Sequence, residues 1–298
     1  MDQRLAAFVA VVEQEGFSRA GLALHMTQPA VSQQVQALER ELGARLLERS
    51  NRFLHLTPAG EIVYDHARQI LEVEERMRRY VSDLTNVASG SLTIGASYTI
   101  GEYLLPLVLA AFQRRYPLVT PAVTIANTQH VAELVVARRL DLGLVEGEVT
   151  LPQAQTQPLL EDRLTIIAPP GHRLAGRSEV APEELAGATW IVREAGSGTR
   201  AASDAFMADH GLRSVAQLEF GSTQMIKEAI AAGMGISLLS RWATRREVAQ
   251  GALAELSVAG TPCVRQFSAL TLRSRFRTRA LDVFLRLLDE MTPDLAAS

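Results

Sequence analysis

The chain has 298 residues, of which 47% are hydrophobic, and it carries a formal net charge of −3. This composition is ample for a packed core and excludes a generally polycationic protein, so nucleic-acid binding would have to come from a localised surface. The single cysteine, Cys263, excludes an intramolecular disulfide and an all-cysteine zinc site. Neither an apolar run of transmembrane length nor a signal-peptide pattern occurs, so we expect a cytoplasmic protein without a membrane partner.

The opening of the chain predicts three short helices. The first carries apolar residues at helical spacing, namely Leu5, Phe8, Val9 and Val12. A second helix is predicted to begin at Ser18, whose hydroxyl can accept a hydrogen bond from an unpaired backbone N–H. A third should begin after Thr27, a capping residue, because Pro29 is tolerated within the first turn. Three such helices predict a helix-turn-helix domain.

The third helix has two unlike faces. One is a predicted buried stripe, formed by Val31, Val35, Leu38 and Leu42. The other carries Pro29, Ser32, Gln33, Gln36 and Arg40. A glutamine amide can donate to and accept from adenine in the major groove, so this face suits the reading of bases. A merely solvated helix face is the alternative, and for an isolated helix it is the commoner one.

A short hairpin is predicted next, because alternating residues follow the turn signal Ser50-Asn51. It would form the wing of a winged helix-turn-helix. Six arginines balance six acidic residues over positions 1–60, so a broad basic footprint is absent. Arg45, Arg49 and Arg52 nevertheless cluster here and can hold phosphate oxygens. Pairing of these arginines with Glu41 and Glu48 is the competing interpretation.

A long helix is predicted from Pro58, because Thr57 supplies a cap and only Gly60 interrupts the stretch before Gly90. Apolar residues follow steps of four and three: Val63, Ala67, Ile70, Met77, Val81, Leu84 and Ala88. This spacing predicts a dimerising coiled coil, broken in its seam by Glu74. A helix lying on its own domain is the alternative.

From Ser91 onward, strand-like and helix-like segments alternate. Strands are predicted over 92–96, 119–125 and 142–145, with helices over 100–116 and 129–139. This βαβαβ order predicts a parallel sheet. A second α/β unit follows, with strands over 164–168, 189–192, 217–220 and 236–239 and helices starting near Ser197 and Ser222. A strand over 267–272 and an amphipathic helix over 278–290 come last.

Several distinct short motifs are spread along the chain: Phe17-Ser18, Thr27-Gln28-Pro29-Ala30-Val31-Ser32, Leu38-Glu39, Leu42-Gly43, Leu56-Thr57-Pro58-Ala59-Gly60, Asp141-Leu142-Gly143-Leu144 and Gly233-Met234-Gly235-Ile236. With them the chain resembles the LysR-type transcriptional regulators over essentially its full length. The resemblance implies an α-rich winged helix-turn-helix head (1–57), a linker helix for dimerisation (58–89) and a periplasmic-binding-protein-like α/β effector domain (90–298). It also implies two crossings between subdomains, with subdomain I over 90–162 and 268–298 and subdomain II over 163–267.

The resemblance implies a ligand-responsive DNA-binding regulator, and not an enzyme. Its expected partners are double-stranded promoter DNA and further copies of itself, as a dimer through the linker helix and usually a tetramer, with RNA polymerase as a further candidate. The residues expected to contact DNA are Ser18, Thr27, Gln28, Pro29, Ser32, Gln33, Gln36, Arg40, Arg49 and Arg52.

A cleft between α/β subdomains brings helix N-termini towards a ligand, where free N–H groups favour an anion. The resemblance implies Ser97, Thr99 and Thr199 as effector contacts. Further candidates are Asn127, Thr128, Glu146, Ser197 and Ser222. Simple helix capping is the alternative for the three serines.

Residues 97–106 and the Gly-Ser-Gly-Thr-Arg segment at 196–200 are similar to a sub-group associated with sulfur and related anion metabolism. We therefore expect a small oxyanion or carboxylate as effector, without a cofactor. Glu146 would oppose an anion unless it is protonated, paired with Arg200 or turned away, and it could instead favour a ligand with an amine.

Two rival classes share the predicted α/β architecture. An enzyme is disfavoured because the six histidines show no metal-ligand spacing, and neither a Gly-x-Ser-x-Gly elbow nor a Walker loop occurs. Cys263 also has no evident base. An exported solute-binding protein would have the effector fold but not the DNA-binding head.

Overall fold

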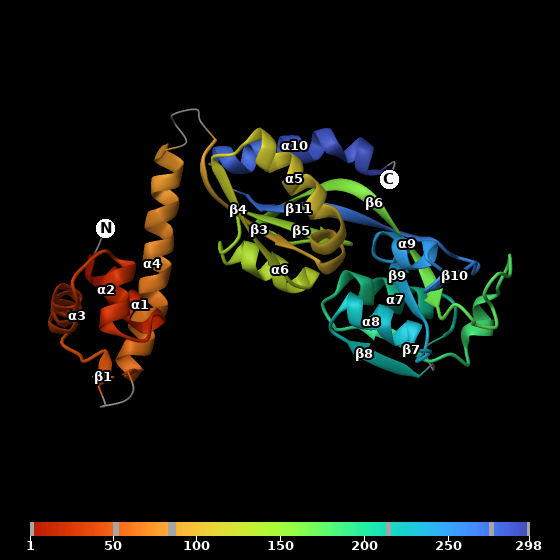
Figure 1. Cartoon of the computed structure of the whole chain (residues 1–298), viewed down its shortest axis with the longest axis horizontal. Helices are drawn as coiled ribbons and strands as arrows, with labels where there is room; N and C mark the ends of the chain where they lie inside the picture. The colour runs from red at the N-terminus through yellow and green to blue at the C-terminus, as the bar shows by residue number, and fades with distance from the viewer. Residues whose placement is uncertain (1–2, 50–53, 83–87, 213–215, 274–276, 297–298) are drawn as a thin grey trace. The chain divides into compact units, whose positions relative to one another are not determined.

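The computed structural model describes residues 3–49, 54–82, 88–212, 216–273 and 277–296 (Figure 1). The chain forms two compact units, Met1–Thr85 and Asn86–Ser298, and each is described by itself below. Among the described residues, no helix combines the length and the apolar character that a membrane crossing requires.

The first unit is a small helical domain with a β-hairpin. Helices α1 (Gln3–Glu13), α2 (Phe17–Ala23) and α3 (Gln28–Leu42) enclose a core that includes Phe8, Val35 and Leu46. Strands β1 (Leu47–Arg49) and β2 (Leu54–Leu56) pair antiparallel, as the predicted wing requires. The turn between them lies outside the described residues. The winged helix-turn-helix prediction is therefore confirmed in its helices and strands.

The ends of the helices agree with the predictions only in part. Thr27 caps α3 and accepts a hydrogen bond from the Ala30 N–H at 3.4 Å. The predicted cap at Ser18 is wrong, because α2 begins at Phe17 and its capping position is Gly16, which has no side chain to offer. Leu42 is not buried but 48% exposed, since α3 ends there and Gly43 turns the chain away with a φ of 65°.

Helix α4 (Pro58–Ser82) follows the wing and has two different halves. Its first half packs on the head through Val63 and Ala67, as the alternative interpretation expected. Its second half presents an apolar stripe whose members are all at least half exposed: Ile70, Val73, Met77 and Val81. The predicted continuous seam is wrong at its far end, because Ala88 packs against the core of the second unit. Leu84 lies outside the described residues.

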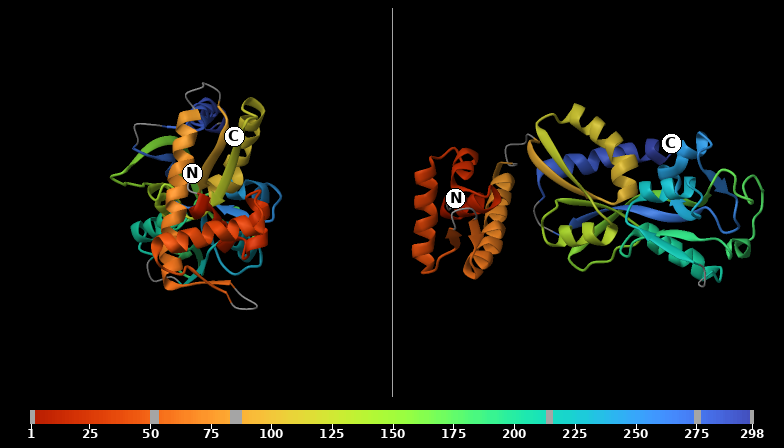
Figure 2. Two further views of the ribbon diagram at one scale, coloured as in Figure 1. Left: turned by 90° about the vertical axis from the view of Figure 1, so that its left-hand side faces the viewer. Right: turned by 60° about the horizontal axis from the view of Figure 1, so that its bottom comes forward.

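The second unit is built on a seven-stranded mixed sheet and a separate two-stranded sheet. Parallel strands β3 (Gly90–Ala96), β4 (Val119–Ile125) and β5 (Leu142–Glu146) confirm the predicted βαβαβ order. Helices α5 (Leu105–Arg115) and α10 (Arg279–Ala296) cover one face, and α6 (Thr128–Val136) covers the other (Figures 1 and 2). A single turn of π-helix, η2 (Ile100–Leu104), precedes α5.

Two long strands run through the whole unit. Strand β6 (Ala154–Ala168) pairs antiparallel with β11 (Cys263–Leu272). With β10 (Ala254–Leu256) at one edge, the sheet order is β10-β6-β11-β5-β3-β4. Both strands are longer than predicted. Part of each strand has no regular alternation of exposed and buried residues, so the sequence pattern did not reveal its full length. One end of each strand lies in one apolar core and the other end in a second core. We call residues 90–162 and 268–298 the first subdomain and 163–267 the second.

The second subdomain is the more irregular half. Strands β7 (Trp190–Arg193) and β8 (Gln217–Phe220) form a parallel pair, while β9 (Ser237–Ser240) and β10 (Ala254–Leu256) join β6. Helices α7 (Gly198–Asp209), α8 (Thr223–Ala231) and α9 (Arg241–Ala249) surround them, with a 3₁₀ turn at Pro182–Leu185. The sequence patterns missed α9 and β10, because α9 is rich in arginine and β10 has only three residues.

Candidate effector site and DNA-contacting face

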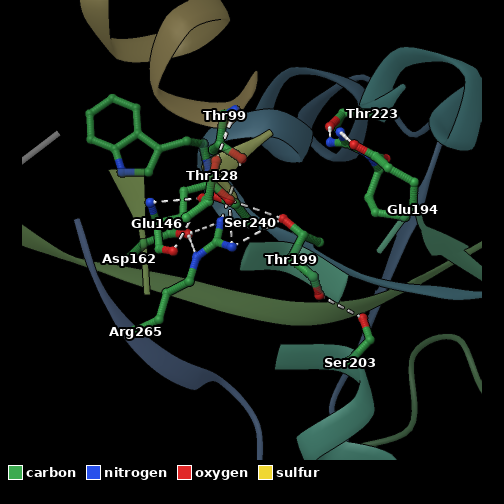
Figure 3. Close-up of polar contacts among 12 residues, drawn as sticks. Thr99, Thr128, Glu146, Asp162, Glu194, Thr199, Ser203, Thr223, Ser240 and Arg265 are labelled. Carbon is green, nitrogen blue, oxygen red and sulfur yellow. Dashed lines mark hydrogen bonds and ion pairs between the residues drawn. The ribbon is translucent and has the colours of Figure 1, made fainter. Parts of the chain in front are cut away.

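A buried ion cluster lies where the two subdomains meet. Arg265 on β11 stands directly opposite Asp162 on β6, and Glu146 ends the neighbouring strand β5. The Arg265 guanidinium is 2.6 Å from Glu146 Oε2 and 2.7 Å from Asp162 Oδ2. The side chains of Arg265, Glu146 and Asp162 are 6%, 3% and 0% exposed, respectively. Figure 3 shows the three side chains converging from separate strands.

Neutral groups complete the hydrogen bonding of this cluster. The Thr99 N–H donates to Glu146 Oε1 at 3.0 Å, and the Thr199 hydroxyl donates to Glu146 Oε2 at 3.2 Å. Arg265 in turn donates to the hydroxyls of Thr199 at 3.0 Å and Thr99 at 3.4 Å. Ser240 donates to Asp162 Oδ1 at 2.6 Å. The cluster is therefore satisfied from both subdomains, as burial of charge requires.

The two carboxylates of the cluster differ in their electrostatic surroundings. Burial opposes ionisation of Glu146, but the Arg265 charge and the nearby polar groups of Ser97 and Thr99 outweigh it and lower the pKa of Glu146. At Asp162 burial prevails over the same guanidinium, and the pKa of Asp162 is raised. Two carboxylates thus share one guanidinium.

Four of the predicted effector residues meet at this cluster. Thr99, Thr199 and Glu146 belong to it directly, and the Thr128 hydroxyl accepts from the Glu146 N–H at 3.3 Å. Ser97 is nearly inaccessible, and among the described residues its hydroxyl has no hydrogen-bond partner of acceptable geometry. These hydroxyl groups therefore lie at the boundary between the subdomains.

The remaining candidates have other surroundings. Asn127 caps α6 by accepting from the His130 N–H at 2.9 Å, and its amide reaches Glu194 at 3.3 Å. Ser197 lies at the start of α7 without a side-chain capping bond. Ser222 caps α8 and is not part of the cluster, so capping is the role that the structure gives it.

The suggested pairing of Glu146 with Arg200 is wrong. Arg200 instead binds Asp204 and Glu219 on the surface of the second subdomain. The true partner is Arg265, which lies 119 positions after Glu146 in the numbering and carries no local motif. Local patterns gave little signal, because Asp162 stands in the charged run Glu161-Asp162-Arg163 and Arg265 lies just before the strand predicted at 267–272.

A cavity of about 1130 Å³ opens beside the cluster. Its walls come from α6 of the first subdomain and α7 of the second, and both Glu146 and Arg265 reach its lining. Gly198 lets α7 approach closely, because a Cβ at this position would lie 2.5 Å from the Glu146 carbonyl oxygen. Among the described residues, no group of acidic, histidine or cysteine side chains is arranged to hold a metal ion.

The outward face of α3 carries the residues predicted to read DNA. Val31, Val35 and Leu38 are buried against α1 and α2, so the opposite face of the helix is turned outward. Its exposed members are Gln28, Pro29, Gln33, Gln36 and Arg40, while Ser32 is half-buried. Ser18 and Thr27 are exposed near the start of α2 and of α3.

The wing arginines can be described only in part. Arg45 is exposed, the side chain of Arg49 is not described, and Arg52 lies outside the described residues. Glu41 pairs with Arg4 at 2.6 Å, so this carboxylate is engaged away from the wing. Glu39, which the sequence reasoning passed over, accepts from the N–H groups of Leu46 and Leu47 at 2.8 and 3.3 Å. It thereby attaches the first wing strand to α3.

Comparisons with known proteins agree with this arrangement. Residues 3–61 match the family model for the bacterial regulatory helix-turn-helix protein of the lysR family, and residues 85–293 match the LysR substrate binding domain. The HTH-type transcriptional regulator CysL of Bacillus subtilis (strain 168) is 36% identical over 284 residues, which cover 95% of each chain.

Two solved structures are also similar. The regulatory domain of CcmR from Synechocystis PCC6803, in complex with 2-PG, is 31% identical and has a TM-score of 0.65, covering 70% of this chain and 99% of that one. Full-length CbnR complexed with its target DNA is 22% identical with a TM-score of 0.71, covers 97% of this chain and 99% of that one, and shows the shared fold. The chain therefore belongs to the LysR family, as a ligand-responsive, DNA-binding transcriptional regulator and not an enzyme.

Proposed function

We propose that this regulator senses a small oxyanion or carboxylate between its subdomains and changes its grip on promoter DNA in response. The observation that carries the proposal is the setting of the Glu146 carboxylate, which receives the Thr99 N–H, the Thr199 hydroxyl and the Arg265 guanidinium. A backbone N–H, a hydroxyl and a guanidinium are donors that bind external anions in proteins. Glu146 therefore stands in for an anionic ligand.

An effector anion would compete with the Glu146 carboxylate for these donors. Glu146 and Arg265 form part of the lining of the adjoining cavity, so a ligand in the cavity would lie next to the cluster. The complex of CcmR with 2-PG supports a ligand in this domain type. An amine ligand is less favoured, because both oxygens of Glu146 are already engaged.

Replacing Glu146 with glutamine is expected to raise the affinity for sulfate at least about tenfold, which corresponds to about 1.4 kcal/mol. The amide keeps the shape of the side chain but removes the internal negative charge. Calorimetric titration of the full chain measures the effect. Glu148→Gln is the matched control, because Glu148 lines the same cavity but lies outside the cluster.

A panel of probes tests the ligand class: sulfate, sulfite, O-acetylserine, phosphoenolpyruvate, 2-PG and aromatic acids. Binding of at least one anion by the wild type, tightened in Glu146→Gln, is the expected result. If none of them binds either protein, the anion proposal is wrong.

We propose that the exposed face of α3 enters the major groove and that Gln33 and Gln36 read bases. Each substitution by alanine is expected to cost about 1–3 kcal/mol of base discrimination at one operator position while leaving non-specific binding nearly unchanged. Binding to operator variants at fixed salt measures this. Gln14→Ala, an exposed glutamine outside α3, is the control. Equal sequence preference in all three variants would contradict the assignment.

The same proposal extends to the remaining DNA contacts and to assembly. Ser18, Thr27, Gln28, Pro29, Ser32, Arg40, Arg49 and Arg52 would position the head on the backbone and groove edges. Two chains would pair through the exposed stripe of α4, and two pairs would form a tetramer. Closure around the effector would then alter the spacing or bend between bound sites, with RNA polymerase as a further partner in the cytoplasm.

A further inference from the structure

Two aromatic rings of the first subdomain each face a buried cation of the second. The Arg193 guanidinium carbon lies 4.3 Å from the centre of the Tyr98 ring, and Lys227 Nζ lies 5.1 Å from the centre of the Tyr103 ring. Arg193 and Lys227 are only 2% and 4% exposed. A cation over an aromatic face is attracted more strongly when both are withdrawn from water. These contacts therefore join the subdomains on a second set of residues, separate from the Arg265 cluster.

Lys227 is the only lysine among the 30 lysine and arginine residues of the chain. Its ammonium donates to the Ala243 carbonyl oxygen at 3.0 Å and to Glu247 Oε1 at 2.5 Å, and the Tyr103 ring lies beside it. Burial opposes its charge, but Glu247 and the Tyr103 hydroxyl together outweigh that effect, and the pKa of Lys227 is raised. A compact ammonium can interact with partners that lie in these separate directions, whereas the rigid planar guanidinium of arginine cannot.

Arg193 is fixed with equal completeness. It binds both oxygens of Glu194 at 2.7 and 2.8 Å and donates to the Thr223 hydroxyl at 3.0 Å. Thr223 and Lys227 are four residues apart on α8, so they share one face of that helix. Glu194 also accepts from Asn127 of the first subdomain at 3.3 Å. One face of α8 is thus connected to the first subdomain twice. Lys227 contacts Tyr103 directly, and Thr223 is connected to Tyr98 through Arg193.

The rings belong to the turn that also carries Thr99. Tyr98 directly precedes Thr99. Tyr103 lies in the π-helix η2, which begins at Ile100, directly after Thr99. π-helical turns are rare and occur frequently at functional sites. Tyr98 and Tyr103 belong to the same short segment as Thr99, so a displacement of Thr99 would also displace both aromatic rings.

We propose that Lys227, with Arg193, is a positioning residue that clamps α8 of the second subdomain to the Tyr98–Tyr103 segment beside the effector site. The clamp holds the subdomains in one relative arrangement. It also passes a displacement of Thr99 to α8, a step that rests on the proposed function. A binding event at the cluster is thereby converted into movement of the second subdomain.

The test measures the distance between the subdomains in the full chain without any ligand. In a Cys263→Ser background, spin labels are attached at Gln113→Cys and Gln250→Cys, which are exposed positions of the first and second subdomains. Dilution with unlabelled protein isolates distances within one chain. We expect one narrow distribution in the parent protein, and a broader, displaced one in Lys227→Met and in Tyr103→Leu. Lys227→Arg should resemble Lys227→Met.

The matched control is Arg68→Met. The Arg68 guanidinium carbon lies 5.8 Å from the centre of the Tyr64 ring, and both residues stand on α4 of the first unit, so this contact does not join the subdomains. Its distribution should equal that of the parent. Unchanged distances in both Lys227→Met and Tyr103→Leu would overturn the clamp. If Lys227→Met does not fold, the distance distribution of Tyr103→Leu tests the clamp by itself, because Tyr103 is the other partner in the contact.

A second measurement separates this proposal from the anion proposal. Sulfate and 2-PG are added to the labelled proteins while their affinity is measured separately. The clamp predicts that an anion bound by Lys227→Met shifts the distance less than it does in the parent; an equal shift would refute the transmission step. If no anion binds the parent protein, the proposed function fails, while the ligand-free distances still decide the clamp.

Discussion

Replacing Arg265 with methionine is expected to destabilise the effector unit by about 3–5 kcal/mol, the usual cost of breaking a buried ion pair by removing one partner. The substitution would leave Glu146 and Asp162 as two buried carboxylates without a counter-charge. Urea unfolding of the full chain, followed by tryptophan fluorescence, measures the loss. The signal reports only on the effector unit, because both tryptophans, Trp190 and Trp242, lie within it.

A surface ion pair provides the control for Arg265→Met. Arg241 pairs with Glu255, and their side chains are 45% and 29% exposed, so Arg241→Met should cost no more than about 1 kcal/mol. Adding Asp162→Asn to Arg265→Met should restore part of the stability by removing one uncompensated charge. If Arg265→Met is as mild as Arg241→Met, the cluster does not hold the subdomains together electrostatically.

Introducing a glutamate at Met77 is expected to reduce operator affinity by at least about 100-fold, because two linked heads bind far more tightly than one. Met77 is 56% exposed in the apolar stripe of α4, together with Ile70, Val73 and Val81. Burial of this stripe against a second chain would be opposed by the new charge. Analytical ultracentrifugation and operator binding at one salt concentration measure assembly and affinity together.

The control for Met77→Glu adds the same charge elsewhere on the helix. Gln69 is exposed on α4 and stands outside the apolar stripe, so Gln69→Glu should keep both the assembly state and the affinity. An assembly that survives Met77→Glu with full operator affinity would show that α4 does not join the two heads.

Local sequence signals predicted the head well, because the forces that form it act over a few residues. Thr27 caps α3 next to Pro29, and the spacing of Val31, Val35 and Leu38 decides which face is buried. The same reasoning failed at two helix ends. Ser18 was predicted to cap α2, but Gly16 occupies the capping position, and Leu42 was predicted to be buried but is exposed at the end of α3. Helix ends are decided by the balance of neighbouring contacts, which a single capping residue does not settle.

The candidate site was predicted less completely. Thr99, Thr128 and Thr199 were expected near the ligand from family resemblance, and the structure brings them to one cluster. Arg265 and Asp162 were missed, and with them the reason why Glu146 can remain ionised in a buried position. Lys227 carries no local motif, and its contacts with Tyr103 and Glu247 depend on the tertiary structure.

The sequence by itself determined the order of most elements, the two faces of α3 and the family of the protein, because helical and strand periodicity, caps and motifs are written within short stretches. Only the tertiary structure decided the site. Glu146, Asp162 and Arg265 come together because β11 pairs with β5 on one side and with β6 on the other. That pairing depends on strand register across more than a hundred residues of chain, which local patterns do not encode.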